Sequence, residues 1–592
     1  MRRHQGGAIA LALMLMLGVL IGLLVISFAR SVQGNNVADT RTVLAMANAR
    51  EALLGYATTY RDTHPNEVFG YFPCPDLGTG TEGQAASSCG GTDITVVGRL
   101  PWKTLDVGPL RDASGECLWY AVSGNFKNNP KTSDLLNADT NGLVEVMAAD
   151  GSGYIAGASP TQRAVAVVFA PGAILPGQDR VLAATNSPAI CGGNYNAANY
   201  LDSDSASGID NATPAAVSNA LTTFIAAQHS DLTPASTDAF NDQLMVIFPE
   251  DVFARHVERR TDFESDLTDP LIGLLRKSAD CLANYGRSND SGVTFKYLPW
   301  TAQLNVLTFG SSASYTDSGA LSGRLPRTAY TSAYTSPNSN SNYFATPLLD
   351  EARCPGWNSV DKYWENWKDH LFYAVARAHR PDATAASNND PCSITECINV
   401  IDASGTERAN MAAVVLFSGA RLPGQSRNNS ANPSYASTDK ADPSNYLEDP
   451  NLAAILTNPP PGAANRRFSK IAGNDTIMCL SSLPVGAGTE LFVDPTCGAS
   501  TSCVSDGSLL AGYRAGAANN CRVGTSGILT ACETLTRNID INNCPGNGTT
   551  FDANGQPYSC ERAARDFLSD ECLQGFATAK CQLAHTALTT CQ

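Results

Sequence analysis

The chain has 592 residues, too many for one hydrophobic core, and a size of about 150 residues per domain predicts three or four structural units. Apolar residues make up 43% and charged residues 16%, which excludes a disordered or collagen-like chain and predicts a surface rich in Ser, Thr, Asn and Gly. Forty Lys and Arg against 56 Asp and Glu give a net charge of −16. This charge argues against nucleic acid as a partner, because the chain would repel a phosphate backbone.

The N-terminus combines a short basic leader with a long apolar segment. Ala8–Ala29 is 22 residues without a charge, and a helix of that length is about 33 Å long, enough to cross a bilayer. Arg2 and Arg3 precede it, so the positive-inside rule places the leader in the cytoplasm and the rest of the chain outside. A cleaved secretory signal is the alternative, but its apolar region has about 7 to 15 residues. We therefore expect a single transmembrane helix over 8–29.

The next segment predicts a soluble helix that continues this rod. No Gly or Pro interrupts residues 35–54, and Val43, Met46 and Leu53 recur at helical spacing.

The basic leader, Gly6-Gly7 and the apolar segment together resemble the N-terminus of type IV pilins and type II secretion pseudopilins. Over roughly residues 1–200 the chain also looks like pseudopilin-like proteins. The motifs that carry this likeness are Gly70-Tyr71-Phe72-Pro73-Cys74-Pro75-Asp76, Cys89-Gly90-Gly91, Gly98-Arg99-Leu100-Pro101-Trp102-Lys103-Thr104-Leu105 and Cys117-Leu118-Trp119-Tyr120-Ala121-Val122.

This resemblance implies a filament subunit whose leader is cut after a glycine, so that the mature chain begins at Gly7 or Ala8. It implies other pilin or pseudopilin subunits as partners through the N-terminal helix, and an inner-membrane anchor with the rest of the chain in the periplasm or, in a filament, at the cell surface. There is one departure from the family. Pilins usually carry a glutamate at the fifth position of the mature chain, which here is Ala12 for cleavage after Gly7 or Leu11 for cleavage after Gly6.

An internal repeat is the strongest pattern in the sequence. Ala166–Arg180 matches Ala413–Arg427 at 10 of 15 positions without a gap. Flanking matches keep the same order and extend the unit beyond 200 residues. They pair Gly98–Pro101 with Gly323–Pro326, Leu118–Val122 with Leu371–Val375, Asn199–Leu201 with Asn445–Leu447, and Asn241-Asp242 with Asn474-Asp475.

The second copy is expected to contain helices without a membrane segment. Apolar residues keep helical spacing across 251–285, and Pro249 and Pro270 occupy expected first helical positions, which predicts two consecutive helices. Val-rich segments over 118–122, 164–170 and 411–417 lead into Gly/Pro turns and predict strands.

The predicted fold class is α+β. A transmembrane helix continues into a pilin-like helix packed on an antiparallel sheet, the unit is duplicated, and a disulfide-rich domain follows. The expected domains are a leader over 1–7, the membrane helix over 8–29, the two units over 30–248 and 249–480, and a cysteine-rich domain over 481–592.

Eighteen cysteines without zinc-type spacing indicate disulfides and an oxidising compartment. Cys117 aligns with His370 and Cys191 with Ser437 or Thr438, so both cysteines are absent together from the second copy, as a bonded pair predicts. Cys74 and Cys89 bracket a polar loop and form a second candidate pair. Other candidates are Cys392 with Cys397 and, near the C-terminus, Cys560, Cys572, Cys581 and Cys591 as staples of two short helices. The pairing of the ten cysteines from Cys479 onward stays open.

Catalytic patterns are weak, and we expect no enzyme activity, no cofactor and no metal site. No Walker loop, GxGxxG or HExxH occurs, and His256 and His370 are expected to be solvated. Residues 137–142 imitate half of a calcium loop, but the twelfth position is Ala148, which favours an ordinary turn. The tryptophans Trp357, Trp364 and Trp367 either stack on a ligand or, as helical spacing favours, pack in a core.

These patterns predict a membrane-anchored minor pilin-like or pseudopilin-like subunit, at the tip of a type IV pilus or secretion pseudopilus, that presents an exported interaction domain. Two alternatives remain open: a membrane-anchored adhesin that never enters a filament, and an anchored periplasmic hydrolase. The C-terminal domain is either a disulfide-stabilised fold without further function or a module that meets a surface or secreted partner.

Overall fold

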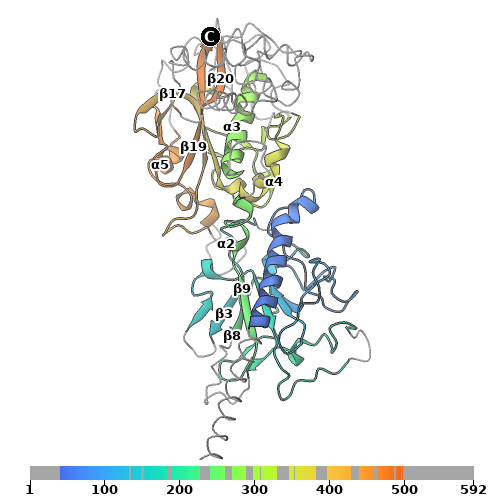
Figure 1. Ribbon diagram of the computed structural model, residues 1–592. Coiled ribbons are helices and arrows are strands. Elements are labelled where there is room, and N and C mark those ends of the chain that lie inside the picture. The colour runs from blue at the N-terminus through green and yellow to red at the C-terminus, as the bar shows by residue number, and fades with distance from the viewer. Residues whose placement is uncertain are drawn as a thin grey trace, which may run out of the picture. The chain divides into compact units, whose positions relative to one another are not determined.

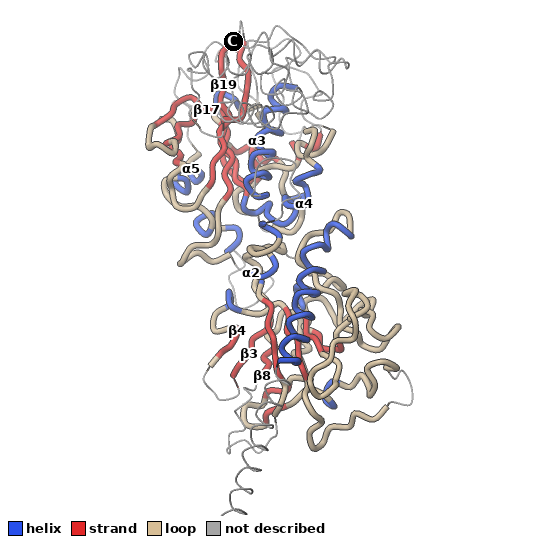
Figure 2. The backbone as a smooth tube through the Cα atoms, viewed as in Figure 1, coloured by secondary structure: helices blue, strands red, loops and turns tan. Residues whose placement is uncertain are grey.

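The computed structural model describes residues 40–132, 135–148, 153–182, 188–226, 240–259, 270–288, 298–306, 308–329, 346–352, 354–381, 397–427, 439–458, 464–485, 488–494 and 497. The chain divides into two compact units, with the boundary between Val257 and Glu258. Figures 1 and 2 show the helices and strands of each unit.

The first unit contains a helix over 40–63 and several small sheets. A four-stranded antiparallel sheet has the order β1-β2-β5-β9, and a three-stranded sheet has the order β4-β3-β8, in which β3 and β8 are parallel. The strands are β1 (Val96–Arg99), β2 (Trp119–Val122), β3 (Val144–Ala148), β4 (Tyr154–Ala156), β5 (Ala166–Ala170), the hairpin β6 (Ser203–Asp204) and β7 (Ile209–Asp210), β8 (Thr222–Ala226) and β9 (Gln243–Ile247), and a short helix, α2 (Pro249–Val252), follows.

The core of the first unit combines side chains from both of its larger sheets. Trp119 and Phe169 from the four-stranded sheet pack with Val146 and Phe224 from the three-stranded sheet, and all four are buried. Strand alternation turns Tyr120 the other way, where its hydroxyl donates to the Pro73 carbonyl oxygen at 3.3 Å.

The second unit is built on one larger mixed sheet. The order is β11-β10-β12-β15-β17-β16-β18, β19 pairs with β17 and β20, and β16 and β18 are parallel. The elements are α3 (Pro270–Ser288), β10 (Thr301–Ala302), β11 (Asp317–Ala320), β12 (Ser322–Arg324), the hairpin β13 (Thr328–Ala329) and β14 (Thr346–Pro347), α4 (Asn358–Trp367), β15 (Leu371–Val375), β16 (Ile398–Ile401), β17 (Glu407–Phe417), α5 (Asn451–Leu456), β18 (Arg466–Ser469), β19 (Thr476–Val485) and β20 (Gly488–Asp494).

Equivalent strands of the two units pair in the same register. Gly98 lies opposite Tyr120 in the first unit, and Gly323 lies opposite Tyr373 in the second. The remaining matches are Ala166 opposite Val122 and Ala413 opposite Val375, Met245 opposite Val168 and Met478 opposite Val415, and Phe224 beside Val146 and Phe468 beside Val400. The antiparallel pairs join positions that the sequence repeat aligns, and the parallel pair extends the correspondence to segments that the repeat did not include.

The expected fold class, with one antiparallel sheet under a long helix in each unit, is wrong. The fold is mixed α/β with several sheets and few helices among the described residues. The error arose because parallel partners are distant in sequence: β3 pairs with β8 and β16 with β18 only after long excursions of the chain. Local patterns of apolar residues carry no information about such pairing.

Two further expectations concern the ends of the chain. Within the part of the chain that the structure describes, which begins at residue 40, no helix has both the length and the apolar character needed to span a bilayer. The predicted membrane helix over 8–29 and the cleavage residues Gly6, Gly7 and Ala8 lie outside the described residues. Strands β19 and β20 carry the sheet of the second unit past the domain boundary that we expected at residue 480.

Candidate interaction site at the Cys117–Cys191 disulfide

The predicted Cys117–Cys191 disulfide is present in the first unit. Cys117 lies two residues before β2, and Cys191 lies in the long loop that follows β5. Their Cα atoms are 5.7 Å apart, within the range of a disulfide. The bond therefore ties the loop after β5 to the start of β2, an inner strand of the four-stranded sheet.

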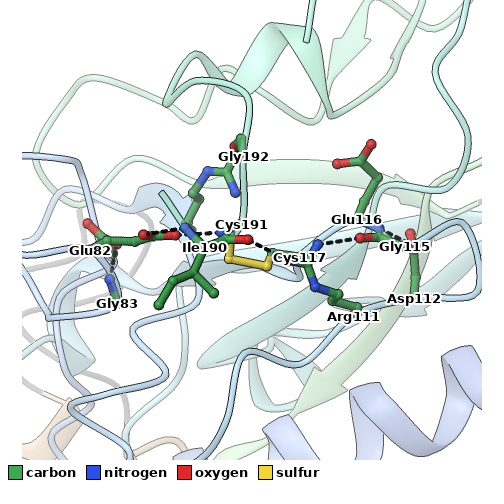
Figure 3. The surroundings of a disulfide bond; sticks show 12 residues. Glu82, Gly83, Arg111, Asp112, Gly115, Glu116, Cys117, Ile190, Cys191 and Gly192 are labelled. Carbon is green, nitrogen blue, oxygen red and sulfur yellow. Dashed lines mark hydrogen bonds between the residues drawn. A yellow bond between two sulfur atoms is a disulfide. The ribbon is translucent and has the colours of Figure 1, made fainter. Parts of the chain in front are cut away.

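Charged side chains hold the same loop on both sides of the disulfide (Figure 3). The Glu82 carboxylate accepts the backbone N–H of Ile190 at 2.8 Å and that of Cys191 at 2.6 Å. From the other side, Arg111 donates to the Ile190 carbonyl oxygen at 2.5 Å and to the Gly115 carbonyl oxygen at 2.6 Å. Hydrogen bonds to ionised groups are the stronger ones in proteins, so the loop is fixed by both covalent and polar contacts.

A small cavity lies beside the disulfide. Arg99 donates to the carbonyl oxygens of Gly192 and Asn194 at 3.0 and 2.8 Å, while its Nη1 atom is buried without a protein partner. The cavity measures about 10 Å³, room for one water molecule and nothing larger. The lining residues are Asp76, Glu82, Arg99, Leu100, Trp102, Leu110, Cys117, Leu118 and Cys191.

The second acid of this cavity, Asp76, is committed to the backbone. Its carboxylate accepts the N–H groups of Gly78 at 2.9 Å and Gly83 at 2.6 Å, and the Tyr195 hydroxyl at 3.2 Å. Burial raises the pKa of Asp76, and the hydrogen bonds from Gly78 and Gly83 oppose that rise. Because both carboxylates hold backbone N–H groups, the cavity is suited to fixing loops and not to acid–base catalysis.

Three of the motifs that resemble pseudopilin-like proteins contribute lining residues to this cavity, namely Asp76, Arg99, Leu100, Trp102, Cys117 and Leu118. Cys74 and Cys89 form the second predicted disulfide, with Cα atoms 5.8 Å apart. Gly83 has φ of +80°, and a Cβ there would lie 2.4 Å from the Trp102 ring, so only glycine fits. The Cys74–Cys89 disulfide and the close packing of Gly83 on Trp102 therefore fix these loops to one another.

The pinned loop presents four exposed apolar side chains, which we call the apolar loop. Ile174 is 56% exposed, Val181 72%, Leu182 62% and Ile190 48%. By the repeat alignment, the positions of the first three are Arg421, Asn428 and Asn429 in the second copy. At these three positions the first unit has apolar side chains where the second copy has polar ones, and exposed apolar side chains that lie together are typical of contact surfaces.

A different cluster is common to both units and explains the repeat. In the first unit, the Tyr200 ring lies 4.8 Å from the guanidinium carbons of both Arg99 and Arg180. In the second unit, Tyr446 lies 4.5 Å from Arg324 and 4.6 Å from Arg427. Because the cluster occurs twice and is buried, we assign it to folding.

The other cysteines fall into two groups, those within the described residues and those outside them. Cys281–Cys354 and Cys479–Cys497 are disulfides, and the second pair is one that the sequence did not choose. Cys397 is disulfide-bonded, while Cys392 lies outside the described residues. Cys560, Cys572, Cys581 and Cys591 also lie outside them.

The structure answers the question of the tryptophans in favour of packing. Trp357, Trp364 and Trp367 are at most 1% exposed, so no ring face is open to a ligand. His370, which was expected to be solvated, is 3% exposed and stacks on Phe417 with ring centres 5.4 Å apart. That expectation is wrong because a strand, β15, begins directly after His370 and carries it into the core.

The half calcium loop at 137–142 forms a turn. The Asn137 side-chain oxygen accepts the Asp139 N–H at 3.0 Å, and the Thr140 hydroxyl donates to the Leu135 carbonyl oxygen at 2.8 Å. This is the Asx-type geometry of an ordinary Asn/Asp turn.

Sequence reasoning missed the polar residues that hold the loop. Glu82 and Arg111 stand outside any repeat or motif, so no local signal marks them. Arg99 did carry a signal, since Gly98–Pro101 recurs at Gly323–Pro326, although it was used only for alignment.

No family model, curated protein or solved structure matches the chain, so the pilin resemblance stays a prediction from the sequence motifs.

Proposed function

We propose that the protein is a membrane-anchored minor subunit of a type IV pilus or type II secretion pseudopilus that sits at the filament tip and presents an exported interaction surface. The observation that carries this proposal is the N-terminal sequence, in which a basic leader and Gly6-Gly7 precede 22 uncharged residues. The helix over 40–63 begins shortly after that segment, which is compatible with one rod.

Two structural features support an exported subunit with a binding role. Cys74–Cys89 and Cys117–Cys191 are disulfides, and disulfides persist in oxidising compartments such as the periplasm. The apolar loop is exposed, and the Cys117–Cys191 disulfide ties the end of it to the sheet, a constraint that lowers the entropy lost when a partner binds.

The missing glutamate supports a terminal position. In the family, the fifth-position glutamate pairs with the N-terminal amine of a neighbouring subunit inside an apolar bundle, where an unpaired carboxylate is costly. A tip subunit has neighbours on one side only, so it does not need the glutamate. The apolar residue at the fifth position of this chain, Ala12 or Leu11, is consistent with that location. Two large units after one membrane segment would also clash with copies stacked along a shaft.

N-terminal sequencing of the mature protein tests the first step of this proposal. We expect the mature chain to begin at Gly7 or Ala8 in cells that contain a prepilin peptidase, and at Met1 in cells that lack it. Leucine substitutions distinguish the sites: Gly7→Leu should block cleavage after Gly7 and Gly6→Leu should block cleavage after Gly6, so each variant is the control for the other. An uncleaved chain in both strains indicates a bitopic adhesin, and cleavage near Ala29 indicates a secreted protein.

A further inference from the structure

Each unit contains two acids linked through backbone hydrogen bonds, and in the first unit both acids are buried and each accepts the other's backbone N–H. In the first unit, Asp202 and Asp242 are 4% and 0% exposed. The Asp202 N–H donates to Asp242 Oδ2 at 2.8 Å, and the Asp242 N–H donates to Asp202 Oδ2 at 3.1 Å. Because each acid accepts the other's N–H, the two carboxylates are held close together.

The donors around this pair leave one carboxylate oxygen without a partner. Gln178 donates to Asp202 Oδ1 at 2.9 Å, and Asn211 donates to Asp242 Oδ2 at 2.9 Å. Asp242 Oδ1 is buried and accepts no hydrogen bond, and neither does the side-chain oxygen of its neighbour Asn241. Two buried oxygens that lack a donor are unfavourable unless a positive group satisfies them.

The second unit has a similar arrangement, in which Glu448 is half-buried and accepts the Asn474 N–H at 3.3 Å instead of the Asp475 N–H. The Glu448 N–H donates to Asp475 Oδ2 at 3.3 Å, and Gln425 and Asn451 donate to Glu448 and Asp475 at 2.8 and 3.0 Å. Asp475 Oδ1 and the Asn474 side-chain oxygen are again buried without partners. The same two atoms are therefore unsatisfied at equivalent positions of both units, which a chance packing defect does not explain.

Electrostatic repulsion opposes the ionisation of both carboxylates in each acidic pair. Asp242 and Asp475 are buried, and each is hydrogen-bonded to the backbone of a second acid, so two ionised carboxylates at either site would repel one another. Arg180 offsets only part of the charge in the first unit, because its guanidinium also pairs with Glu116 at 3.2 Å.

We propose that each unit binds one calcium ion at its acidic pair, with Asp242 Oδ1, the Asn241 side-chain oxygen and Asp202 as ligands in the first unit, and Asp475 Oδ1, the Asn474 side-chain oxygen and Glu448 in the second. The donor set is made of oxygens alone, which selects calcium or magnesium over zinc. Calcium fits better because it accepts amide oxygens and irregular geometry, whereas magnesium demands an octahedron.

These sites differ from a typical acidic metal cluster. The described residues contain no group of three or more His, Cys, Asp or Glu side chains arranged for a metal. Each site has two carboxylates, so amide and carbonyl oxygens or water complete the shell. The ion would join the turn that contains Gln178 or Gln425 to the start of β9 or β19, and so would fasten the last strand of each repeat. The inference does not depend on the proposed filament function.

Calcium binding by the purified full-length protein tests the inference at pH 7.5. We expect the melting temperature to be higher by about 3 °C or more in 5 mM CaCl₂ than in EDTA, because a ligand that binds only the folded state stabilises it. The same concentration of MgCl₂ should give a smaller shift. Equilibrium binding of radioactive calcium should give two ions more in the wild type than in the double variant Asp242→Asn/Asp475→Asn.

The variants separate a metal site from a structural role of the acids. Each single Asn variant should lose one ion, and in EDTA it should melt at or above the wild-type temperature, because one of two repelling charges is gone. Asp179→Asn, which alters an exposed carboxylate next to Gln178, should keep both ions. Equal calcium binding by the wild type and the double variant would overturn the proposal, whether or not the variants are less stable.

Discussion

Arg180 in the first unit and Arg427 in the second make the same set of hydrogen bonds. Each donates through Nη1 to a glycine carbonyl oxygen at 2.9 Å, through Nη2 to a glutamine side chain two residues earlier, and through Nε to the asparagine carbonyl oxygen that precedes the clustered tyrosine. The residues that match in the ungapped repeat are largely those that form this turn. The sequence repeat therefore reflects the residues that both units need in order to fold into this turn.

Removal of one of these guanidinium groups should destabilise the fold. We expect Arg427→Ala to lower the free energy of unfolding by about 3 kcal/mol, since the side chain is fully buried and several backbone acceptors lose their donor. Arg427→Lys should lower the free energy of unfolding by most of the same amount, because an ammonium group lacks the planar set of donors that a guanidinium group has. Urea unfolding monitored by circular dichroism measures both.

Arg467→Ala is the matched control. Arg467 forms an ion pair with Glu407 at 2.9 Å, but both side chains are exposed, and such pairs contribute about 0 to 1 kcal/mol. If Arg427→Ala costs no more than Arg467→Ala, the guanidinium cluster does not hold the repeat together.

The sequence predicted those parts of the fold that depend on local or repeated patterns. The Val-rich segments became β2, β5 and part of β17, and Pro249 and Pro270 begin α2 and α3. The joint absence of two cysteines from the second copy identified Cys117–Cys191. These features are visible because each one is contained in a short segment or in the comparison of the two copies.

Other features depend on contacts that no short segment contains. The parallel pairing of β3 with β8 follows from the tertiary fold, and so does the hold of Glu82 on the loop at Cys191. The recurrence of Asn241-Asp242 at Asn474-Asp475 was visible in the sequence. The pairing of each Asp with a second acid could not be predicted from this recurrence, because the second acid of each pair is distant in sequence.

The Cys117–Cys191 disulfide should stabilise the first unit more than Cys74–Cys89 does. It closes a sequence separation of 74 residues against 15, and the chain-entropy model gives about 4 kcal/mol for the longer loop and about 3 kcal/mol for the shorter. We expect urea midpoints in the order wild type, Cys74→Ser/Cys89→Ser, Cys117→Ser/Cys191→Ser. A Cys117→Ser/Cys191→Ser variant with the wild-type midpoint would show that the bond does not constrain the loop.

Asp369 should make the stability of the second unit sensitive to acid. Burial raises the pKa of Asp369, but the nearby charges of Lys440, at 3.3 Å, and His370 lower it by a larger amount. The pKa therefore lies below the ordinary value of 3.8. The ionised carboxylate therefore stabilises the fold above about pH 4, and this contribution is lost as the pH falls through the folded pKa. At pH 7, Asp369→Asn should cost about 3 kcal/mol because it leaves the buried Lys440 ammonium unpaired.

Urea unfolding at pH 7 and pH 3 tests this dependence. The difference between the wild type and Asp369→Asn should shrink at pH 3, while the exposed control Asp449→Asn should cost less than about 1 kcal/mol at pH 7. A difference that is equal at both pH values would contradict an ionised Asp369.

The apolar loop should affect assembly and not folding. The triple variant Ile174→Arg/Val181→Asn/Leu182→Asn installs the residues that the second copy carries at these positions. Because all three side chains are exposed, the free energy of unfolding should change by less than about 0.5 kcal/mol per site. The number of filaments that carry the protein should fall several-fold, and Val217→Asn, which alters an apolar residue that is 68% exposed elsewhere, should leave it unchanged.

Immunogold labelling of an epitope fused after Gln592 tests the central claim most directly. The full-length tagged protein is expressed in cells that assemble filaments, and the positions of the gold particles are scored by electron microscopy along filaments of measured length. The account predicts label at filament ends only, with few particles per end. Label distributed along the shaft, or filaments without any label, would contradict it.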